Sequence, residues 1–357
     1  MRILYKLFGS EFLFSKGLNI PSSHYLPVAK KRYKVFITRT IPGAALPLLK
    51  KYFQVKVYPK DEKISRIELL KGVKWCDALL CLLTEKIDRE VIDANPNLKV
   101  ISNYAVGYNN IDVAYATKKG IPVCNTPSQQ MTDGVAEHAV ALILGVAKRI
   151  HEAEQVVRQH TWKSWAPSFL LGTLLTGKTL GIVGLGRIGA GVAARMHALG
   201  MKIFYTDVKH DAAFEQQLGA QYLPLAKVLQ QADVVTLHVP LLPETRHLIN
   251  TKTLHLMKKT AYLINTSRGE VVEEQALITA LRKKQIAGAG LDVYESEPQV
   301  NPLLTTLSNC LLTPHTASAT LEVREQMSLD AANNIIAIVL GKGKAKVVNP
   351  EVHRKRP

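Results

Sequence analysis

The chain has 357 residues, 47% hydrophobic and 21% charged, a composition typical of a folded protein with room for two domains. It excludes a largely disordered chain and a membrane-spanning helix, because the longest apolar run, residues 139–147, is far shorter than the roughly 20 residues that a bilayer requires. The net charge of +17 does not mark a nucleic-acid surface, because the first 32 and the last 16 residues carry +5 each and the remaining +7 is spread thinly over the body.

The two ends of the chain are basic. Residues 1–32 lack the continuous apolar core of a secretory signal, and we expect an extension without a fold of its own. A weak targeting segment and a start codon upstream of the true one are open alternatives. Residues 347–357 are expected to form a solvated basic tail.

Cysteine usage bears on the compartment and on metal sites. The spacings fit neither a disulfide framework nor a metal site, so we expect reduced core residues of a cytoplasmic protein, with no metal, nucleic-acid or membrane partner. The four cysteines are Cys76, Cys81, Cys124 and Cys310.

From residue 34 onward, short β-branched runs alternate with helical stretches, which is the pattern of a parallel sheet with crossover helices. The strands of a first α/β unit are expected at residues 35–38, 55–58, 78–83, 99–103 and 122–126. One long helix is expected next, over residues 131–159, because apolar residues recur there at helical spacing.

After this helix the alternation resumes. Six further strands are expected at residues 179–184, 202–207, 233–239, 261–266, 289–293 and 310–314. Six strands with intervening helices are what a doubly wound dinucleotide-binding fold requires. A last helix is expected over residues 321–340.

A glycine pattern follows the first of these six strands and opens a helix, residues 187–199. Gly184 permits the tight turn, Gly186 lets the backbone approach a pyrophosphate, and Gly189 lets the helix and the strand pack closely. The pyrophosphate would rest on the helix N-terminus, where free N–H groups favour an anion. The motif therefore predicts a dinucleotide cofactor.

Asp207 ends the next strand. A carboxylate there accepts hydrogen bonds from ribose hydroxyls and repels a 2′-phosphate, so the sequence favours NAD over NADP. Lys209 and His210, just beyond it, keep NADP open, and a plain turn aspartate is the alternative interpretation of Asp207.

Three ionisable residues follow strands at what should be one carboxyl edge of the sheet, where ligands bind. Arg268 offers a planar fork for a carboxylate, and His315 is a natural proton donor near neutral pH. Glu297 could hydrogen-bond the other ring nitrogen of that histidine. Taken singly, each could be an ordinary surface or core residue, but together they predict a catalytic set.

The segments around these residues carry a family resemblance. SRGEVV, GLDVYESEP and TPHTAS follow GLGRIG in that order, and the match to the D-isomer-specific 2-hydroxyacid dehydrogenases runs from about residue 34 to residue 341. Four more segments look like the glyoxylate/hydroxypyruvate reductase branch of that family: residues 79–88, 105–112, 161–172 and 327–334.

The resemblance implies an α/β fold of two Rossmann-like doubly wound domains. A flavodoxin-like substrate domain would consist of residues 33–128 and 318–346, and an NAD(P)-binding Rossmann domain of residues 129–317 would be inserted into it. This insertion explains why the glycine pattern occurs so late in the chain. A homodimer is also implied, with the helix that starts near Met131 in the interface.

The resemblance further implies that Arg268, Glu297 and His315 are catalytic, that the amides of Val106 and Gly107 hold the substrate carboxylate, and that Asp292 meets the nicotinamide carboxamide. The substrate contacts it implies are Leu82, Leu83, Val106, Gly107, Arg268 and His315. The cofactor contacts it implies are Thr132, Gly184, Gly186, Arg187, Ile188, Gly189, Asp207, Val239, Pro240, Thr245, Thr266, Arg268, Asp292, His315 and Ser318.

Trp162 and Trp165 resemble a segment that reaches into the partner subunit's pocket, and packing within their own loop is the alternative. Thr316 and Ala317 stand where Ile-Gly is more usual in the family, with no predicted consequence.

The implied activity is hydride transfer between NADH and a small 2-oxo acid, glyoxylate or hydroxypyruvate, giving the D-2-hydroxy acid. Reduction of 2-ketogluconate, or another D-2-hydroxyacid dehydrogenase activity, is the alternative within the family. A non-enzymatic, NAD-sensing protein similar to transcriptional corepressors is an alternative of a different class, because such proteins share the fold and the motifs.

Overall fold

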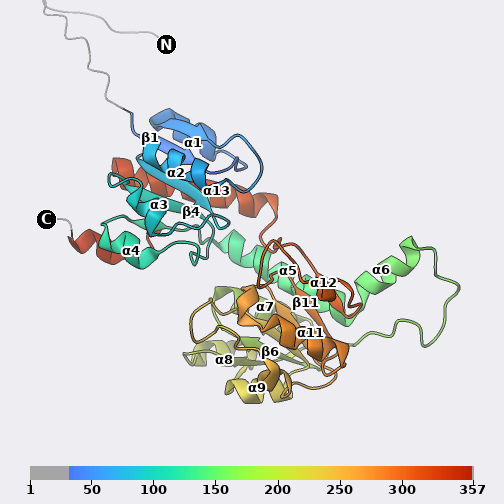
Figure 1. Cartoon of the computed structure of the whole chain (residues 1–357). Helices are drawn as coiled ribbons and strands as arrows, with labels where there is room; N and C mark the ends of the chain where they lie inside the picture. Colours follow the sequence, from blue (N-terminus) through green and yellow to red (C-terminus); the bar gives the residue numbers. More distant parts are fainter. Residues whose placement is uncertain (1–31, 356–357) are drawn as a thin grey trace, which may run out of the picture. The chain divides into compact units, whose positions relative to one another are not determined.

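The structure, a computed structural model, describes residues 32–355, and the side chains of residues 353–355 are not described. The N-terminal extension, residues 1–31, and the last two residues of the tail therefore lie outside the described residues. The described chain contains two sheets of parallel strands covered by helices (Figure 1). This arrangement confirms the predicted α/β fold class.

The first sheet has the strand order β2-β1-β3-β4-β5, which is the flavodoxin-like doubly wound order. Its strands are β1 (Lys34–Ile37), β2 (Gln54–Val57), β3 (Ala78–Leu82), β4 (Val100–Tyr104) and β5 (Val123–Cys124). Its helices are α1 (Ala45–Tyr52), α2 (Arg66–Trp75), α3 (Arg89–Asp93), α4 (Val113–Lys118) and α13 (Leu321–Leu340).

Both faces of the first sheet are buried, which explains why its strands are apolar runs rather than alternating ones. Val35 and Leu80 point to a core shared with α1 and α13, whereas Phe36 and Leu79 point to the core on the opposite face. The C-terminal helix α13 thus packs against strands formed more than 200 residues earlier (Figure 1). The exact limits of the two predicted domains stay a prediction.

The second sheet has the order β12-β11-β10-β9-β6-β7-β8, a doubly wound order that reverses between β6 and β9. Its strands are β6 (Thr179–Val183), β7 (Lys202–Thr206), β8 (Gln221–Tyr222), β9 (Val234–Leu237), β10 (Tyr262–Asn265), β11 (Gly288–Leu291) and β12 (Cys310–Leu312). Its helical segments are α5 (Gln129–Ala147), α6 (Ile150–Arg158), α7 (Arg187–Ala198), α8 (Ala212–Leu218), α9 (Leu225–Gln231), α10 (Thr251–Leu254), η1 (Gly269–Val271), α11 (Glu274–Arg282) and α12 (Pro302–Thr305). The prediction missed β8 because its two exposed residues show no apolar pattern.

The single helix predicted over residues 131–159 is wrong. The chain forms two helices, α5 and α6, and Arg149 between them adopts left-handed backbone angles with φ 56°. Its guanidinium binds Glu152 at 2.7–2.8 Å and so fixes the start of the second helix. The apolar spacing continued across the break, so the pattern alone did not reveal it. The segment after the break extends away from the second sheet (Figure 1).

The predicted solvated tail is wrong for residues 347–352. Val347 forms an antiparallel bridge with Cys124 at the edge of the first sheet, and the Val348 N–H donates to the carbonyl of Val123. Asn349 is buried and accepts a hydrogen bond from the Val123 N–H at 2.8 Å. The edge strand β5 left backbone groups unpaired, and this segment satisfies them.

Among the helices of residues 32–355, none combines the length and the apolar composition that a membrane-spanning helix needs.

Candidate active site

The register of the second sheet brings the predicted site segments to one edge. Val183 pairs with Leu237, Leu237 with Asn265, and Asn265 with Leu291, which in turn pairs with Leu312. Because all these strands are parallel, the residues that follow each strand meet at the same carboxyl edge. That edge therefore collects the glycine turn, residues 266–268, Asp292 and His315.

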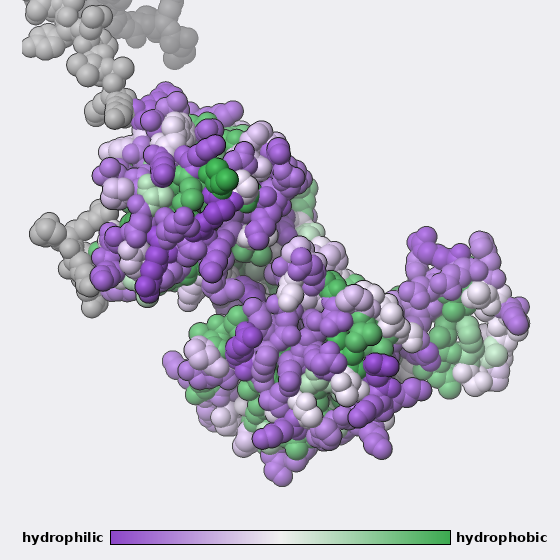
Figure 2. All heavy atoms as spheres, in the orientation of Figure 1, coloured by the Kyte–Doolittle hydropathy of each residue, from purple (hydrophilic) through white to green (hydrophobic). Residues whose placement is uncertain are grey.

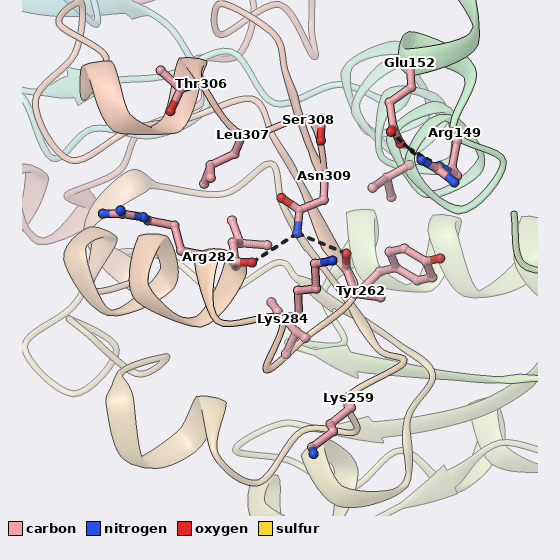
Figure 3. Close-up of a pocket in the computed structure, with 14 residues that line it drawn as sticks. Arg149, Glu152, Lys259, Tyr262, Arg282, Lys284, Thr306, Leu307, Ser308 and Asn309 are labelled. Carbon is pink, nitrogen blue, oxygen red and sulfur yellow. Dashed lines mark hydrogen bonds and ion pairs between the residues drawn. The ribbon is translucent and has the colours of Figure 1, made fainter. Parts of the chain in front are cut away.

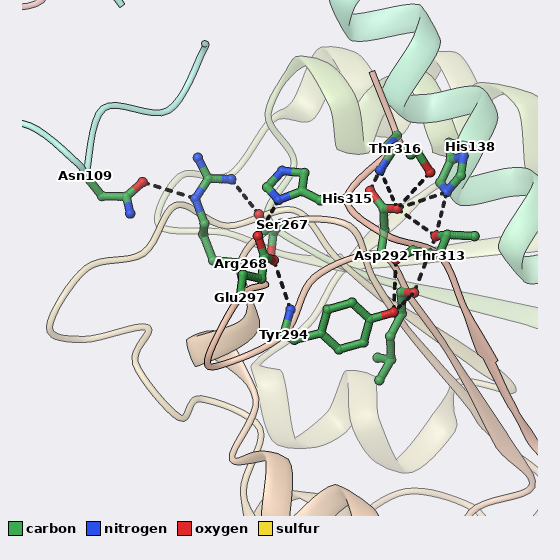
Figure 4. A network of polar contacts seen from close by, with 12 residues as sticks. Asn109, His138, Ser267, Arg268, Asp292, Tyr294, Glu297, Thr313, His315 and Thr316 are labelled. Carbon is green, nitrogen blue, oxygen red and sulfur yellow. Dashed lines mark hydrogen bonds and ion pairs between the residues drawn. The ribbon is translucent and has the colours of Figure 1, made fainter. Parts of the chain in front are cut away.

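His315 and Glu297 form a hydrogen-bonded pair at this edge (Figure 4). The ring Nδ1 lies 2.7 Å from Oε2 of Glu297, and the two side chains are 28% and 29% exposed. The other carboxylate oxygen accepts a hydrogen bond from the Tyr294 N–H at 3.0 Å. The backbone of His315 is left-handed, with φ 53°. The structure thus joins the two residues as predicted, and the Nε2 atom has no partner among the described residues.

Asp292 organises the turn that carries His315. Its buried carboxylate accepts hydrogen bonds from the Thr313 hydroxyl at 2.6 Å and from the N–H groups of Thr316 and Ala317 at 2.8 Å. Burial alone would raise the pKa of Asp292, but hydrogen bonds from His138, Thr313 and this backbone lower it below its usual value. Ala317 contributes its backbone N–H, and Thr316 adds a hydroxyl that lies 3.4 Å from Asp292 Oδ1, so both residues are compatible with the turn.

Arg268 lies between the two sheets' loops (Figure 4). Its Nε donates to Asn109 Oδ1 at 3.1 Å and its Nη1 to the Ser267 carbonyl at 2.6 Å. The remaining Nη2 covers Gly107 so closely that a Cβ on this glycine would lie 1.7 Å from it. Burial lowers the pKa of the guanidinium, while Glu297 acts to raise it, and an arginine remains charged at neutral pH.

The loop after β4 carries Val106 and Gly107. Asn103 donates to the carbonyl of Gly107 and Asn125 to that of Val106, both at 2.8 Å. Within residues 32–355, the N–H groups of these two loop residues have no hydrogen-bond partner. The loop therefore presents two free backbone donors beside Arg268, as a carboxylate site requires.

Sequence reasoning missed the residues that hold these loops. Glu85 is 2% exposed and accepts hydrogen bonds from the Leu82 N–H at 2.6 Å and the Thr38 hydroxyl at 2.7 Å. It fixes the end of β3, where Leu82 is half-buried and Leu83 is exposed. Asn110 similarly donates to the Leu82 carbonyl at 3.1 Å. A clustering of amide side chains near strand ends was the only available signal.

The glycine turn fits a dinucleotide. Gly184 has φ +96°, and a Cβ there would lie 2.8 Å from the backbone of His238. A Cβ on Gly189 would lie 2.2 Å from the Gly184 carbonyl, whereas one on Gly186 would meet open space. α7 then begins at Arg187 without a side-chain cap. Its first N–H groups are therefore free to bind an anion next to a backbone that nothing covers.

Asp207 borders this turn. Its Oδ2 accepts a hydrogen bond from the Leu185 N–H and its Oδ1 one from the Val208 N–H, both at 2.6 Å. A carboxylate has about four acceptor positions, so it retains capacity for ribose hydroxyls.

Further along the edge, the buried Thr266 hydroxyl has no partner within the described residues. An unsatisfied buried hydroxyl is what a site for a polar ligand leaves behind.

The remaining predicted cofactor contacts occupy the same edge or line it. Thr132 is buried on α5 near Gly191 of α7, and Ile188 is half-buried in the first turn of that helix. Ser318 is half-buried just beyond the turn that carries His315. The loop after β9 holds Val239, Pro240 and Thr245, closed by a 2.6 Å hydrogen bond from the Thr245 hydroxyl to the Pro240 carbonyl.

Residues 150–174, which begin with α6, carry several exposed apolar side chains, and we call this segment the arm. Trp162 and Trp165 are 59% and 79% exposed, and the indole N–H of Trp162 donates to the Ser164 carbonyl of its own loop at 3.0 Å. The two interpretations of these residues stay predictions. Figure 2 shows apolar side chains gathered on this segment. Its exposed apolar residues are Ile150, Val157, Trp162, Trp165, Phe169, Leu171 and Leu174.

A cavity of about 550 Å³ lies elsewhere, at the amino ends of β10 and β11 (Figure 3). It is lined by Arg149, Glu152, Lys259, Arg282 and Lys284 among others. None of the predicted site residues lines it. The candidate site is therefore the opposite, carboxyl edge of the same sheet.

Sequence comparison finds relatives of this chain among known proteins. The family model for the D-isomer specific 2-hydroxyacid dehydrogenase NAD binding domain matches residues 140–317. A glyoxylate reductase from Thermofilum pendens is 50% identical over 330 residues, 91% of this chain and 97% of that protein.

Solved structures are similar as well. A protein from Thermus thermophilus has a TM-score of 0.83 and 40% identity, covering 88% of this chain and 99% of that one. An NADPH-dependent glyoxylate/hydroxypyruvate reductase from Sinorhizobium meliloti, solved with NADP and malonate, has a TM-score of 0.77 and 32% identity. The match covers 89% of this chain and 97% of that one.

Proposed function

The chain belongs to the D-isomer specific 2-hydroxyacid dehydrogenases, and we propose that it reduces glyoxylate or hydroxypyruvate to the D-2-hydroxy acid with NADH. The observation that carries this proposal is the His315–Glu297 pair beside Arg268 and the free amides of residues 106 and 107. An acid, a carboxylate-binding cation and two backbone donors meet there, as reduction of a 2-oxo acid requires.

Substrate binding falls to the groups that cover Gly107. The Nη2 of Arg268 and the N–H groups of Val106 and Gly107 would hold the substrate carboxylate from two sides. This clamp fixes the orientation of the adjacent C2 carbonyl. Charge near the carbonyl oxygen, supplied by the same guanidinium, stabilises the negative charge that develops on it.

Proton transfer falls to His315. Its Nδ1 is engaged by Glu297, so Nε2 is the atom that can donate to the carbonyl oxygen. The carboxylate stabilises the charged imidazolium and fixes the ring orientation. Reduction therefore requires the charged form of this ring, and the reverse reaction requires the neutral form.

The cofactor would be held by the glycine turn, the N-terminus of α7 and Asp207. When bound, a nicotinamide dinucleotide supplies the hydride that C2 of the substrate accepts. A preference for NADH is supported by Asp207, whose charge repels a 2′-phosphate, and by His210, which is paired with Glu215 at 2.8 Å. The Sinorhizobium relative is NADPH-dependent, so this preference would distinguish the two proteins.

The preference has a direct test. Asp207→Ala should lower the ratio of kcat/KM for NADH over NADPH by about 10-fold or more, because the repulsion of the 2′-phosphate is removed. Asp211→Ala, at a nearby helix cap, is the matched control and should leave the ratio unchanged. An unchanged ratio in Asp207→Ala would remove this residue from cofactor selection.

The substrate is best tested with a panel of 2-oxo acids. We expect steady oxidation of NADH with glyoxylate and hydroxypyruvate, slower turnover with 2-ketogluconate, and D-glycerate as the product from hydroxypyruvate. NADH binding without turnover on any 2-oxo acid would instead favour an NAD-sensing protein. An L-product would contradict the family assignment of stereochemistry.

A homodimer is also part of the proposal. The exposed apolar residues of the arm support it, because apolar patches of this kind mark interaction surfaces. Light scattering should give twice the chain mass. Leu171→Glu on the arm should weaken the dimer, whereas Leu242→Glu, an exposed leucine outside the arm, should not. A monomeric wild type would contradict this part.

A cytoplasmic location is supported by the cysteines. All four are free and buried, and burial raises the pKa of Cys76, Cys124 and Cys310 to about 12. Such thiols are poor nucleophiles and suit a reducing compartment. Localisation of the full chain in its source cells would test this.

A further inference from the structure

We propose that His138 on α5 is a positioning residue for the reaction. It acts through Thr313 and Asp292, which hold the turn of residues 313–317 so that His315 stays in place. This inference rests on the proposed function, in which His315 is the proton donor. It adds a residue that lies on a helix rather than at the strand edge, and that never touches the substrate.

The contacts form a directed chain (Figure 4). The Thr313 hydroxyl donates its single hydrogen to Asp292 Oδ1 at 2.6 Å, so in its contact with His138 it can only accept a hydrogen bond. His138 Nε2 lies 3.0 Å from that hydroxyl oxygen and 3.4 Å from the Asp292 carboxylate. The ring nitrogen Nε2 therefore carries a hydrogen and serves as the donor at the start of the chain.

Thr313 connects this chain to both members of the proposed acid pair. Its carbonyl accepts a hydrogen bond from the Tyr294 hydroxyl at 2.9 Å, and the Tyr294 N–H binds Glu297. The N–H of His315 in turn lies 3.1 Å from the carbonyl of Thr313 and 2.9 Å from that of Asp292, and donates to both. A shift of Thr313 would therefore displace the histidine and the glutamate together.

The turn needs this support because its central residue is strained. His315 has φ 53°, a left-handed conformation that costs a residue with a Cβ free energy and persists only where its surroundings determine it. Two of the turn's N–H groups bind the Asp292 carboxylate, so the orientation of that carboxylate fixes the turn. His138 Nε2 lies 3.4 Å from Asp292 Oδ1, the same oxygen that accepts the hydrogen bond from the Thr316 N–H (Figure 4).

Packing alone does not explain a histidine at this position. The helical spacing of α5 places residue 138 with apolar neighbours such as Val135, Ala139 and Leu142, and an aliphatic side chain would continue that stripe. The side chain is 22% exposed, so it is neither a free surface residue nor a fully buried one. A polar residue that departs from the local pattern often marks a functional constraint.

The test compares His138→Leu, which removes the donor, with His138→Gln, which keeps an N–H donor. In His138→Leu we expect kcat for glyoxylate to fall about 10-fold, with KM for glyoxylate and NADH affinity changed less than about 2-fold. The pH at which kcat is half-maximal should also shift, because the pairing of His315 with Glu297 changes. His138→Gln should restore kcat to within about 3-fold of the wild type.

His255→Leu is the matched control, because this histidine is also hydrogen-bonded, to the Thr251 carbonyl at 2.6 Å, but lies at the end of α10 away from the site. It should leave kcat and the pH profile unchanged. Full kcat in His138→Leu would overturn the proposal, and so would equal losses in the Leu and Gln variants, since the donor would then be irrelevant.

A second readout separates this inference from the proposed function. In protein labelled with ¹³C at histidine, the ring resonance of His315, assigned through His315→Gln, should move in His138→Leu and not in His255→Leu. This shift is expected even if no 2-oxo acid is reduced, so inactivity of the wild type would reject only the proposed function. An unmoved resonance together with an unchanged pH profile would reject the positioning role.

Discussion

Two histidine–glutamate pairs take their glutamates from one short segment, residues 294–298. The two pairs are similar in their hydrogen-bond distance, exposure and histidine backbone conformation. His315 Nδ1 lies 2.7 Å from Glu297, and His247 Nε2 lies 2.5 Å from Glu295. The histidine side chains are 28% and 37% exposed. Both histidines also have left-handed backbones, with φ 53° and 51°. The pair itself therefore does not identify a proton donor.

The surroundings of the two pairs differ. Arg268, close enough to Glu297 to feel its charge, covers Gly107 and the free amides of the loop after β4. The His247 backbone instead joins two loops, since its N–H donates to the Glu270 carbonyl and its carbonyl accepts from Asn250. One pair has a place for a carboxylate beside it, and the other has a structural joint. Groups that could bind a substrate, rather than the geometry of the pair, are the reason we propose His315 and not His247 as the proton donor.

The largest expected effect separates the two histidines. His315→Gln should lower kcat for glyoxylate reduction about 10³-fold, because no group remains to donate the proton. His247→Gln should change kcat less than about 3-fold, because its pair has no substrate site beside it. NADH affinity, measured by fluorescence, should be retained by both variants and shows that each is folded. Comparable losses in the two variants would mean that the pairs share the chemistry and that the surroundings do not distinguish them.

The sequence alone predicted the carboxyl-edge residues well, because their placement follows from strand order. Once strands are parallel, residues such as Asp207, Arg268 and His315 must meet at one edge, and each directly follows a recognisable apolar run. The helical spacing of apolar residues predicted α13 as Leu321–Leu340, because nothing interrupts that spacing.

What the sequence could not supply depends on contacts between distant segments. The break at Arg149 rests on one backbone angle and an ion pair, and residues 347–352 found an edge strand more than 200 residues earlier. The supports of the site, such as Glu85 and His138, carry no motif of their own. His138 has the same helical spacing as the apolar residues of α5, so the pattern does not distinguish it from them.

The second prediction concerns Arg268 and Gly107, which lie beside the His315–Glu297 pair and not beside the His247–Glu295 pair. Arg268→Lys keeps the charge but loses the planar fork, so kcat/KM for glyoxylate should fall about 10²-fold, mainly through a higher KM. Gly107→Ala should have a similar effect without replacing the arginine, because its Cβ would lie 1.7 Å from Nη2 and would displace the guanidinium. Gly120→Ala, with open space around its Cβ but φ +73°, controls for a glycine replacement. A normal KM for glyoxylate in both site variants would contradict the proposal that these groups bind the substrate carboxylate.

The smallest effect concerns His238, a histidine of the same edge whose ring contacts the Thr236 hydroxyl at 2.9 Å instead of a glutamate. Burial lowers the pKa of His238 to about 4, below the value of 6.5 for an unperturbed histidine. Between these two pH values the unfolded chain binds more protons than the folded one, so stability is complete above pH 6.5 and falls as the pH drops toward 4.

This difference can be measured with a variant that cannot titrate. Between pH 7 and pH 5, the wild type should lose about 2 kcal/mol of unfolding free energy that His238→Gln does not lose. Urea denaturation of both proteins at the two pH values gives this difference and cancels the contributions of the other groups. His247→Gln removes a histidine that is paired with a carboxylate, and it should not abolish the loss of stability between pH 7 and pH 5. If His238→Gln lost as much stability as the wild type, burial would not keep this ring neutral. His238 would then not differ in this respect from the histidines that are paired with a glutamate.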